Sequence, residues 1–141
     1  MNCKDKEGCR KKHLQWLKNQ KKYIPIGQKE LDNFLSHLET NPECLVYDRH
    51  FEKNRSFKRS ITRKDVTEIL KNGWVIERKI KHGMVSLLIM GYTKNGKNYR
   101  PIHVVCDVVK KDLWVVTTTY DSRSMWWKWD DTFQQRICFC K

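Results

Sequence analysis

Apolar residues in the second quarter of the chain recur at helical spacing. Leu31, Phe34, Leu35 and Leu38 follow the i, i+3, i+4, i+7 pattern that places side chains on one face of a helix. The pattern predicts a helix over residues 29–39, and Asn41-Pro42 is expected to end it. Before it, residues 9–22 are basic and contain few strongly apolar positions, and Tyr23-Ile24-Pro25-Ile26-Gly27 interrupts them. We predict a separate short helix or a basic arm there.

A further helix is predicted to begin after Thr62. Thr62 is an N-cap residue, and Asp65 stands three positions later, where an acidic side chain favours the start of a helix. Val66, Ile69 and Leu70 are expected to face the core, and Asn72-Gly73 ends the segment.

After Gly73 the period changes from helical to extended. Four segments are rich in β-branched, aromatic or alternating apolar residues, and we predict strands at 74–79, 84–90, 100–109 and 113–120. The Asn-Gly pair within 94–97 and the turn at 110–112 would join them in antiparallel order. The expected fold is therefore α+β, with N-terminal helices packed on an antiparallel β-meander of about four strands.

Alternation along the last two strands predicts which side chains share a face. In the third strand Ile102 and Val104 point one way, and His103 and Val105 point the other. In the fourth strand Trp114, Val116, Thr118 and Tyr120 are expected on one face, with Thr118 and Tyr120 presenting hydroxyls together at its end.

The charge of the chain indicates which class of partner it binds. The 141 residues contain 29 Lys and Arg against 16 Asp and Glu, a formal net charge of +13. This excess is larger than the roughly 2–8 charges that solubility requires, which favours a polyanion, and nucleic acid above all, over a merely solvated surface. No apolar run of membrane-spanning length and no secretion signal stand in the sequence, so we expect a cytoplasmic protein without a membrane partner.

The six cysteines of the chain could form disulfides, bind a metal or remain free thiols. A cytoplasmic chain keeps its thiols reduced, so disulfides are not expected, and Cys44 and Cys106 have the pattern of small buried residues. The terminal residues Cys3, Cys9, Cys138 and Cys140 are the alternative: a four-thiolate zinc site with His13 as a possible substitute ligand. Their spacing matches no standard zinc knuckle, and unpaired thiols without metal are the favoured interpretation.

Cutting RNA without a metal requires a base, cations that stabilise the phosphorane, and an acid. His50 is the candidate base, because imidazole exchanges protons near neutrality and cations crowd the segment around it. Arg55 and Arg59, four residues apart, would share a helical face and grip phosphate oxygens. His103 or Tyr120 would be the acid. The alternatives are a surface histidine, a solvated basic face and a half-buried tyrosine.

Other residues are candidates for holding the substrate. Cationic side chains at Arg49, Lys53 and Lys58 would meet phosphates, and the hydroxyl of Thr118 would add a polar contact. Trp126 and Trp127 beside basic residues could stack unpaired bases, although core packing is the commoner use of such aromatics.

From His50 to Tyr120 the order of features resembles the DUF4258 family, small bacterial and phage domains often compared with RelE-like toxin ribonucleases. That family opens with a histidine, two arginines and an isoleucine leading into a helix, and residues 50–62 look like this opening. Gly73-Trp74-Val75-Ile76-Glu77, Ile102–Cys106 and Leu113–Tyr120 are similar to its later segments. The resemblance implies a RelE- or barnase-like fold and a metal-independent endoribonuclease of toxin type.

One spacing departs from the family. The histidine and first arginine usually stand four apart, whereas His50 and Arg55 are five apart, about 140° around a regular helix. Either the helix begins after His50, or Asn54 and Lys58 occupy the expected positions and the activity is altered. The second reading favours the rival hypothesis, a non-catalytic module that binds nucleic acid or protein, such as a phage factor that inhibits a host system.

The expected organisation has three parts. Residues 1–45 form a basic helical extension, residues 46–121 the α+β core, and residues 122–141 a Trp- and Cys-rich tail packing on that core. RNA is the expected partner, an antitoxin or a host protein is a further candidate, and no cofactor is expected.

Overall fold

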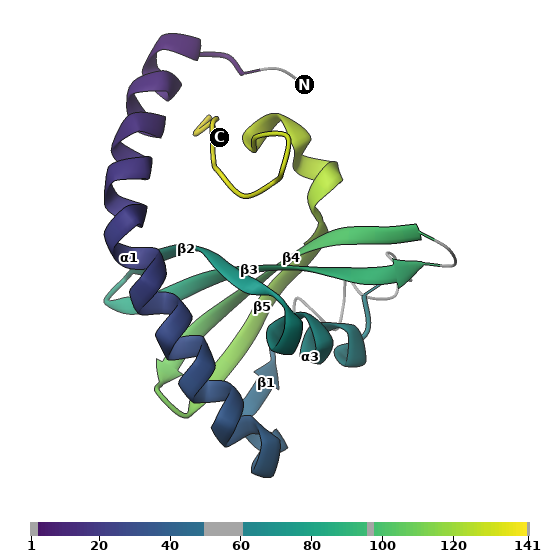
Figure 1. The fold of residues 1–141 in the computed structure, drawn as a ribbon. Coiled ribbons are helices and arrows are strands. Elements are labelled where there is room, and N and C mark those ends of the chain that lie inside the picture. Colours follow the sequence, from purple (N-terminus) through teal and green to yellow (C-terminus); the bar gives the residue numbers. More distant parts are fainter. Residues whose placement is uncertain (1–2, 50–60, 96–97, 141) are drawn as a thin grey trace.

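The computed structural model describes residues 3–49, 61–95 and 98–140. Its elements surround one sheet, with α3 (Arg63–Asn72) and the second half of the long N-terminal helix on one side and the C-terminal segment on the other (Figure 1). In chain order they are α1 (Lys6–Thr40), η1 (Pro42–Cys44), β1 (Leu45–Tyr47), α3 (Arg63–Asn72), β2 (Trp74–Lys81), β3 (Met84–Asn95), β4 (Asn98–Lys110), β5 (Leu113–Asp121) and η2 (Ser122–Lys128). The predicted α+β class is confirmed.

The long helix α1 corrects the prediction of two separate segments. It runs through Pro25, although proline removes a backbone donor and crowds the preceding turn. Figure 1 shows the helix axis changing direction along its length, as expected for a helix with an internal proline. Contacts with the sheet on both sides of Pro25 hold the two halves in one helix, because Trp16, Gln20, Leu31 and Phe34 are all buried.

The sheet has five strands in the order β1-β5-β4-β3-β2. The four predicted strands form the expected antiparallel meander, with β3 and β4 extending as a long hairpin from Val85↔Val108 to Asn95↔Asn98. The short strand β1 was not predicted, and it pairs in parallel with β5. Three residues carry too little alternation to be recognised as a strand, and the resulting sheet is mixed.

One face of the sheet carries the larger core. Leu31 and Phe34 from α1 and Ile69 from α3 pack against it, and Phe34 stacks on Trp114 with ring centroids 4.2 Å apart. A Cβ at Gly27 would lie 2.9 Å from Leu87, so glycine lets α1 approach the sheet closely. The predicted Thr62–Asp65 capping box is present at the start of α3.

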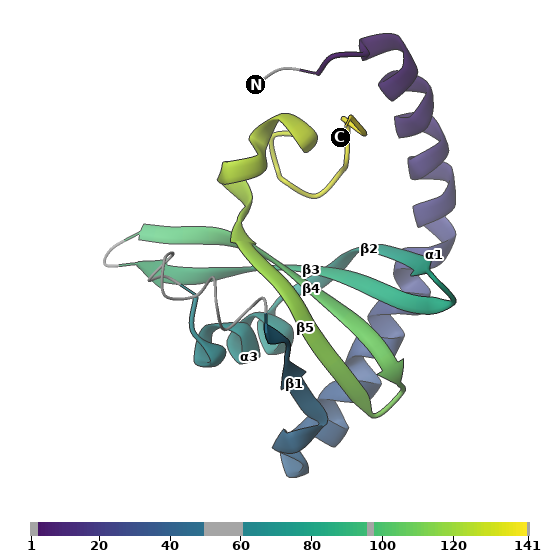
Figure 2. The same ribbon diagram turned by 180° about the vertical axis from the view of Figure 1, so that it is seen from behind.

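The tail after β5 covers the opposite face. Ile76, Leu88 and Met90 form a second core with Trp129, which is 5% exposed. Figures 1 and 2 both show this segment curling over the sheet on the side away from α3. Because α1 crosses the β2 edge, its first half lies beside the tail and its second half lies on the α3 side. Among the described residues, no helix has the length and apolar character needed to cross a membrane.

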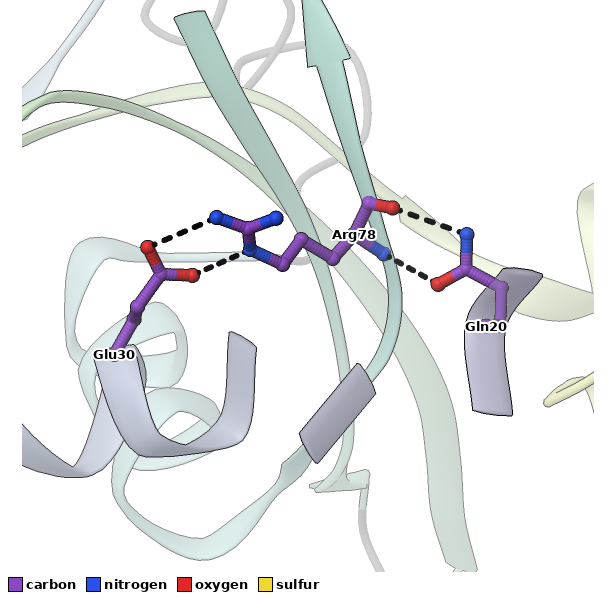
Figure 3. Close-up of polar contacts among 3 residues, drawn as sticks. All are labelled: Gln20, Glu30 and Arg78. Atoms are coloured by element: carbon purple, nitrogen blue, oxygen red, sulfur yellow. Dashed lines mark hydrogen bonds and ion pairs between the residues drawn. The ribbon is translucent and has the colours of Figure 1, made fainter. Parts of the chain in front are cut away.

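Side chains of α1 satisfy the free backbone groups of the edge strand β2. The Gln20 amide accepts from Arg78 N–H at 2.9 Å and donates to the Arg78 carbonyl at 3.0 Å (Figure 3). The Gln28 side chain accepts from Val75 N–H at 2.8 Å. The Arg78 guanidinium in turn reaches Glu30, with Nε 2.7 Å from Oε1. Helix side chains therefore take the place of a neighbouring strand and protect the edge from pairing.

Candidate functional site

A small pocket opens between the second face of the sheet and the tail. Its volume is about 130 Å³, which is below the range of about 300–1,000 Å³ typical of pockets for whole small molecules. The pocket has room for one phosphodiester group of a larger ligand. The sheet and the tail contribute the lining residues Glu77, Lys79, Ser86, Leu88, Val105, Tyr120, Met125, Lys128, Trp129 and Arg136.

Glu77 is the acidic group of this pocket. A bulge in β2 after Val75 leaves Ile76 outside the regular pairing and sets Glu77 opposite Leu88, on the face that the tail covers. The side chain is 7% exposed, and its Oε2 accepts a 2.6 Å hydrogen bond from Trp16 Nε1 of α1. A buried carboxylate held in this way is a positioned proton acceptor.

Cations outnumber the carboxylate around the pocket. Lys79 is exposed on β2, while Lys128 and Arg136 come from the tail. The Arg136 side chain is fixed by its own segment, because Nε donates to the Cys138 carbonyl at 3.1 Å and the guanidinium lies 4.8 Å from the Phe139 ring centroid. Three cations against one carboxylate favour an anionic ligand such as phosphate.

His103 lies beneath the pocket rather than in it. The ring is 0% exposed, and its Nε2 lies 2.8 Å from the Phe133 carbonyl oxygen. A carbonyl only accepts, so Nε2 must carry the proton. Burial lowers the pKa of His103 from 6.5 to about 4, so the ring is neutral at physiological pH and Nδ1 is an acceptor. Nδ1, 3.0 Å from Tyr120 Oη, therefore accepts from the tyrosine hydroxyl.

Tyr120 connects this buried histidine to the pocket. Burial and the neighbouring Glu77 charge raise the pKa of Tyr120 to about 12, while Arg136 lowers it in part. The phenol is therefore protonated at neutral pH, and its proton points towards His103. Of the two predicted acids, Tyr120 lines the pocket and His103 does not. The catalytic roles of both residues stay predictions.

The prediction that Trp114, Val116, Thr118 and Tyr120 share one face is wrong. Val116 pairs with Cys106 and Thr118 pairs with Val105, so the strand skips one residue at a bulge. Trp114 and Val116 pack in the larger core, whereas Tyr120, paired with His103, faces the tail. Alternation fails here because an irregularity of one residue reverses every later side chain. Thr118 is half-buried and is not among the residues that line the pocket.

The predicted stacking residues lie on η2. Trp126 is 54% exposed and Trp127 is half-buried, and their rings meet edge to face with centroids 6.3 Å apart. The third tryptophan of this cluster, Trp129, is buried and lines the pocket. Exposure of Trp126 is compatible with base stacking, which stays a prediction.

Most of the predicted basic opening lies outside the described residues. This applies to His50, Lys53, Arg55, Lys58 and Arg59, whereas Arg49 is described and exposed. On either side of the segment, Tyr47 and Ile61 pack with the larger core, on the α3 side of the sheet. The pocket with Tyr120 opens on the other side. Of the described members of the predicted set, His103 and Tyr120 lie together, with Nδ1 3.0 Å from Oη, whereas Thr118 does not line the pocket.

Four groups of the pocket were missed by sequence reasoning: Glu77, Lys79, Lys128 and Arg136. The position of Glu77 at the end of the apolar run Trp74-Val75-Ile76 was a usable signal, because a carboxylate is rarely buried in a strand unless it has a partner. Nothing in the spacing of Lys128 and Arg136 indicates that the tail folds back over the sheet. A larger groove of about 810 Å³ lies at the far end of the sheet, between α1 and the strand turns, and none of the predicted site residues that the structure describes lines it.

The chain also holds a candidate metal site away from this pocket. The sulfur atoms of Cys3, Cys9, Cys138 and Cys140 all lie within 4.8 Å of one another. His13 is not part of this group, because its Nδ1 contacts the Arg136 carbonyl oxygen at 2.6 Å. The four sulfurs therefore lie together at the two ends of the described chain.

Comparison with known proteins identifies one family. The profile described as "Domain of unknown function (DUF4258)" matches residues 47–121, just over half of the chain. No curated protein and no solved structure gives a significant match. The matched range contains β2 to β5 and therefore Glu77 and Tyr120, whereas the tail cations and α1 lie outside it. The chain belongs to the DUF4258 family.

Proposed function

We propose that this protein is a metal-independent endoribonuclease of the toxin type, acting at the pocket between the sheet and the tail. The supporting observation is that the pocket combines a buried carboxylate, a phenol and three cations in a space of phosphate size. The net charge of +13 adds an attraction for RNA over the whole molecule. The resemblance to RelE-like ribonucleases belongs to the same proposal.

The proposed reaction is attack of the RNA 2′-oxygen on the adjacent phosphorus. Glu77 takes the 2′-hydroxyl proton while Lys128 and Arg136 stabilise the charge of the phosphorane. The bond from phosphorus to the 5′-oxygen then breaks, and the Tyr120 hydroxyl turns from His103 Nδ1 to give its proton to the leaving oxygen. Water returns a proton to the phenolate and removes the one on Glu77. The products are a 2′,3′-cyclic phosphate and a 5′-hydroxyl.

His50, Arg55 and Arg59 are the alternative machinery. In that version His50 is the base and the two arginines hold the phosphate, as the family resemblance implies. The two versions differ in which residue abolishes cleavage. Glu77 has the advantage of a defined position and a defined partner in Trp16.

The second candidate function is an RNA- or protein-binding module without catalysis. One observation favours it: the Tyr120 proton is engaged with His103, and His103 has a lowered pKa of about 4, so neither is a ready acid near neutrality. Such a module would use the same basic pocket, and an antitoxin or host protein would be a candidate partner.

Glu77→Gln separates these possibilities. The glutamine keeps an oxygen for Trp16 but removes the base, so we expect the cleavage rate to fall by about 10²–10⁴-fold, the usual contribution of general base catalysis. RNA affinity should stay the same or rise, because one negative charge leaves the pocket. Rates come from a labelled RNA, and circular dichroism checks the fold.

The matched variants are His50→Ala and Glu68→Gln, the latter on the exposed side of α3. Both should retain cleavage if Glu77 is the base. Loss of cleavage in His50→Ala alone would show that the active site lies in the basic segment that begins at His50. Binding without any cleavage by the wild-type protein would favour the second function.

Growth arrest is the cellular counterpart of the proposal. Inducible expression in bacteria should stop growth if the chain is a toxin ribonuclease, and Glu77→Gln should relieve the arrest at equal protein level. Equal arrest by both proteins would show that toxicity does not depend on this carboxylate.

A further inference from the structure

The two ends of the chain meet beside the first turns of α1. Figures 1 and 2 both show the N- and C-terminal segments next to each other, on the side of the sheet that the tail covers. Four cysteines lie at this meeting point, and we call them the terminal thiol cluster: Cys3, Cys9, Cys138 and Cys140. Cys9 and Cys138 are buried, and Cys3 and Cys140 are half-buried.

The distances within the cluster are those of a tetrahedral metal site. Zinc binds thiolate sulfur at about 2.3 Å, so two sulfurs of a regular tetrahedron lie about 3.8 Å apart. The sulfur of Cys140 lies 3.6 Å from that of Cys9 and 3.8 Å from that of Cys3. Cys9 and Cys138 are separated by 4.0 Å. A disulfide would need about 2.05 Å, and all six cysteines of the chain are free thiols.

Chance does not readily gather these four residues. The sulfurs come in two pairs from opposite ends of the sequence, with Cys9 and Cys138 separated by 129 residues. Without a metal, four buried or half-buried thiols would pack no better than four small apolar side chains. Packing alone therefore does not explain why cysteines occupy these positions. The other two cysteines, Cys44 and Cys106, stand apart in the larger core, as ordinary buried cysteines do.

The surroundings of the cluster suit thiolates. The Phe139 backbone N–H donates to Cys9 Sγ at 3.2 Å, the kind of outer hydrogen bond that stabilises a metal-bound sulfur. A zinc ion with four thiolates carries a net charge of −2, and beside the N-terminal pair Lys4, Lys6 and Arg10 outnumber Asp5 and Glu7. Lysine and arginine at these positions offset that charge.

We propose that the terminal thiol cluster binds one zinc ion as a structural site. Four protein ligands leave no open position for water or substrate, which is the arrangement of structural rather than catalytic zinc. Soft thiolate ligands in a tetrahedral arrangement favour zinc over magnesium or calcium. The inference does not depend on what the pocket does.

The site would fasten the tail to α1. The tail segment that ends in Cys138 and Cys140 also contains Trp129 and Arg136, and His13 of α1 contacts the Arg136 carbonyl. Few other regular elements hold this segment: after η2 it has an isolated bridge between Trp129 and Arg136. A metal at its end therefore replaces the secondary structure that the tail lacks, and the binding free energy of zinc contributes to folding.

Metal content of the purified wild-type protein is the first test. We expect one zinc per chain by elemental analysis after expression in zinc-containing medium. Refolding with Co²⁺ should give the intense sulfur-to-cobalt charge-transfer and visible bands of a tetrahedral four-thiolate site. Less than about a tenth of a zinc per chain together with a Co²⁺ spectrum of free ion would overturn the proposal, as would stoichiometric iron in place of zinc.

Serine variants locate the metal. Cys138→Ser and Cys140→Ser should lose most of the zinc, whereas Cys44→Ala and Cys106→Ala, the matched controls, should keep one zinc per chain. Should a terminal variant fail to fold, thiol counting on the wild type decides: four thiols protected until a chelator is added support the site. Four thiols that react at once, or are oxidised in pairs, overturn it.

Discussion

His103 was predicted as a candidate general acid, but its surroundings give it a structural role. Its Nε2–H and Nδ1 are both used, by the Phe133 carbonyl and the Tyr120 hydroxyl, and the Trp129 ring lies edge-on with centroids 4.7 Å apart. The ring therefore joins β4, β5 and the tail at one point. A buried polar residue with every hydrogen bond made stabilises a unique arrangement more than it offers reactivity.

Acid should destabilise the protein through His103. The ring binds a proton in the unfolded chain below pH 6.5 but in the folded chain only below about pH 4, so the unfolded state binds more protons between these values and stability falls as pH falls through this window. The difference corresponds to roughly 3 kcal/mol at full effect. Urea unfolding from pH 7 to pH 4 measures it.

The comparison variants for this experiment are His103→Asn and His82→Asn. In His103→Asn the unfolding free energy should change little between pH 7 and pH 4, whatever its value at pH 7. The second changes an exposed turn residue whose positive φ of 53° asparagine tolerates, and it should keep the decline. An unchanged slope in His103→Asn would show that other groups cause the acid sensitivity.

At the scale of elements, α1 and β2 depend on each other. The helix has a proline in its interior and the strand is an edge, and each is completed by the other through Gln20, Gln28 and the Glu30–Arg78 ion pair (Figure 3). Amide side chains are well suited to this edge, because each carries a donor and an acceptor in the geometry of a peptide group.

Gln20→Leu should therefore cost more than an ordinary helix substitution. It leaves the N–H and carbonyl of Arg78 without their partner in a partly buried position, at about 1–3 kcal/mol for each unsatisfied group. We expect a loss of about 2–4 kcal/mol in unfolding free energy. Gln15→Leu changes an exposed glutamine one turn away and should stay within about 0.5 kcal/mol. Similar losses in both variants would contradict the edge role of Gln20.

Sequence reasoning recovered the elements better than their contacts. The four strands and the Thr62 cap were predictable because alternation and capping are local patterns. The continuity of α1 was not, because the interactions that hold it across Pro25 come from the sheet. Glu77 and Tyr120 were placed by bulges in β2 and β5, and a bulge has no local signal that alternation alone can detect.

At the scale of the whole molecule, the tail was predicted to pack on the core, but its particular contacts were not. It closes the second face of the sheet, provides Lys128 and Arg136 for the pocket, and brings Cys138 and Cys140 to the N-terminal cysteines. These contacts join residues far apart in the sequence, so no periodic pattern could reveal them. The family match covers the sheet, whereas the tail side of the pocket and the helix α1 lie outside the matched range.

RNA binding should depend steeply on salt. Each phosphate neutralised by a cation adds about 0.7 to the slope of log affinity against log salt for single strands, so a chain with a charge of +13 should show a clear negative slope. Lys128→Gln should reduce the magnitude of that slope by about 0.7 if Lys128 meets a phosphate. Lys71→Gln, on α3, should leave it unchanged. Fluorescence anisotropy at several salt concentrations gives these slopes.

The most direct measurement compares two labelled RNAs that differ in one atom, the 2′-oxygen at a mapped cut site, in buffer without added divalent metal. The account predicts that the natural RNA is cut to a 2′,3′-cyclic phosphate and a 5′-hydroxyl, and that the 2′-deoxy substrate is bound with similar affinity but left intact. Cutting of the 2′-deoxy substrate, 5′-phosphate products, or binding of both RNAs with no cleavage of either would contradict it.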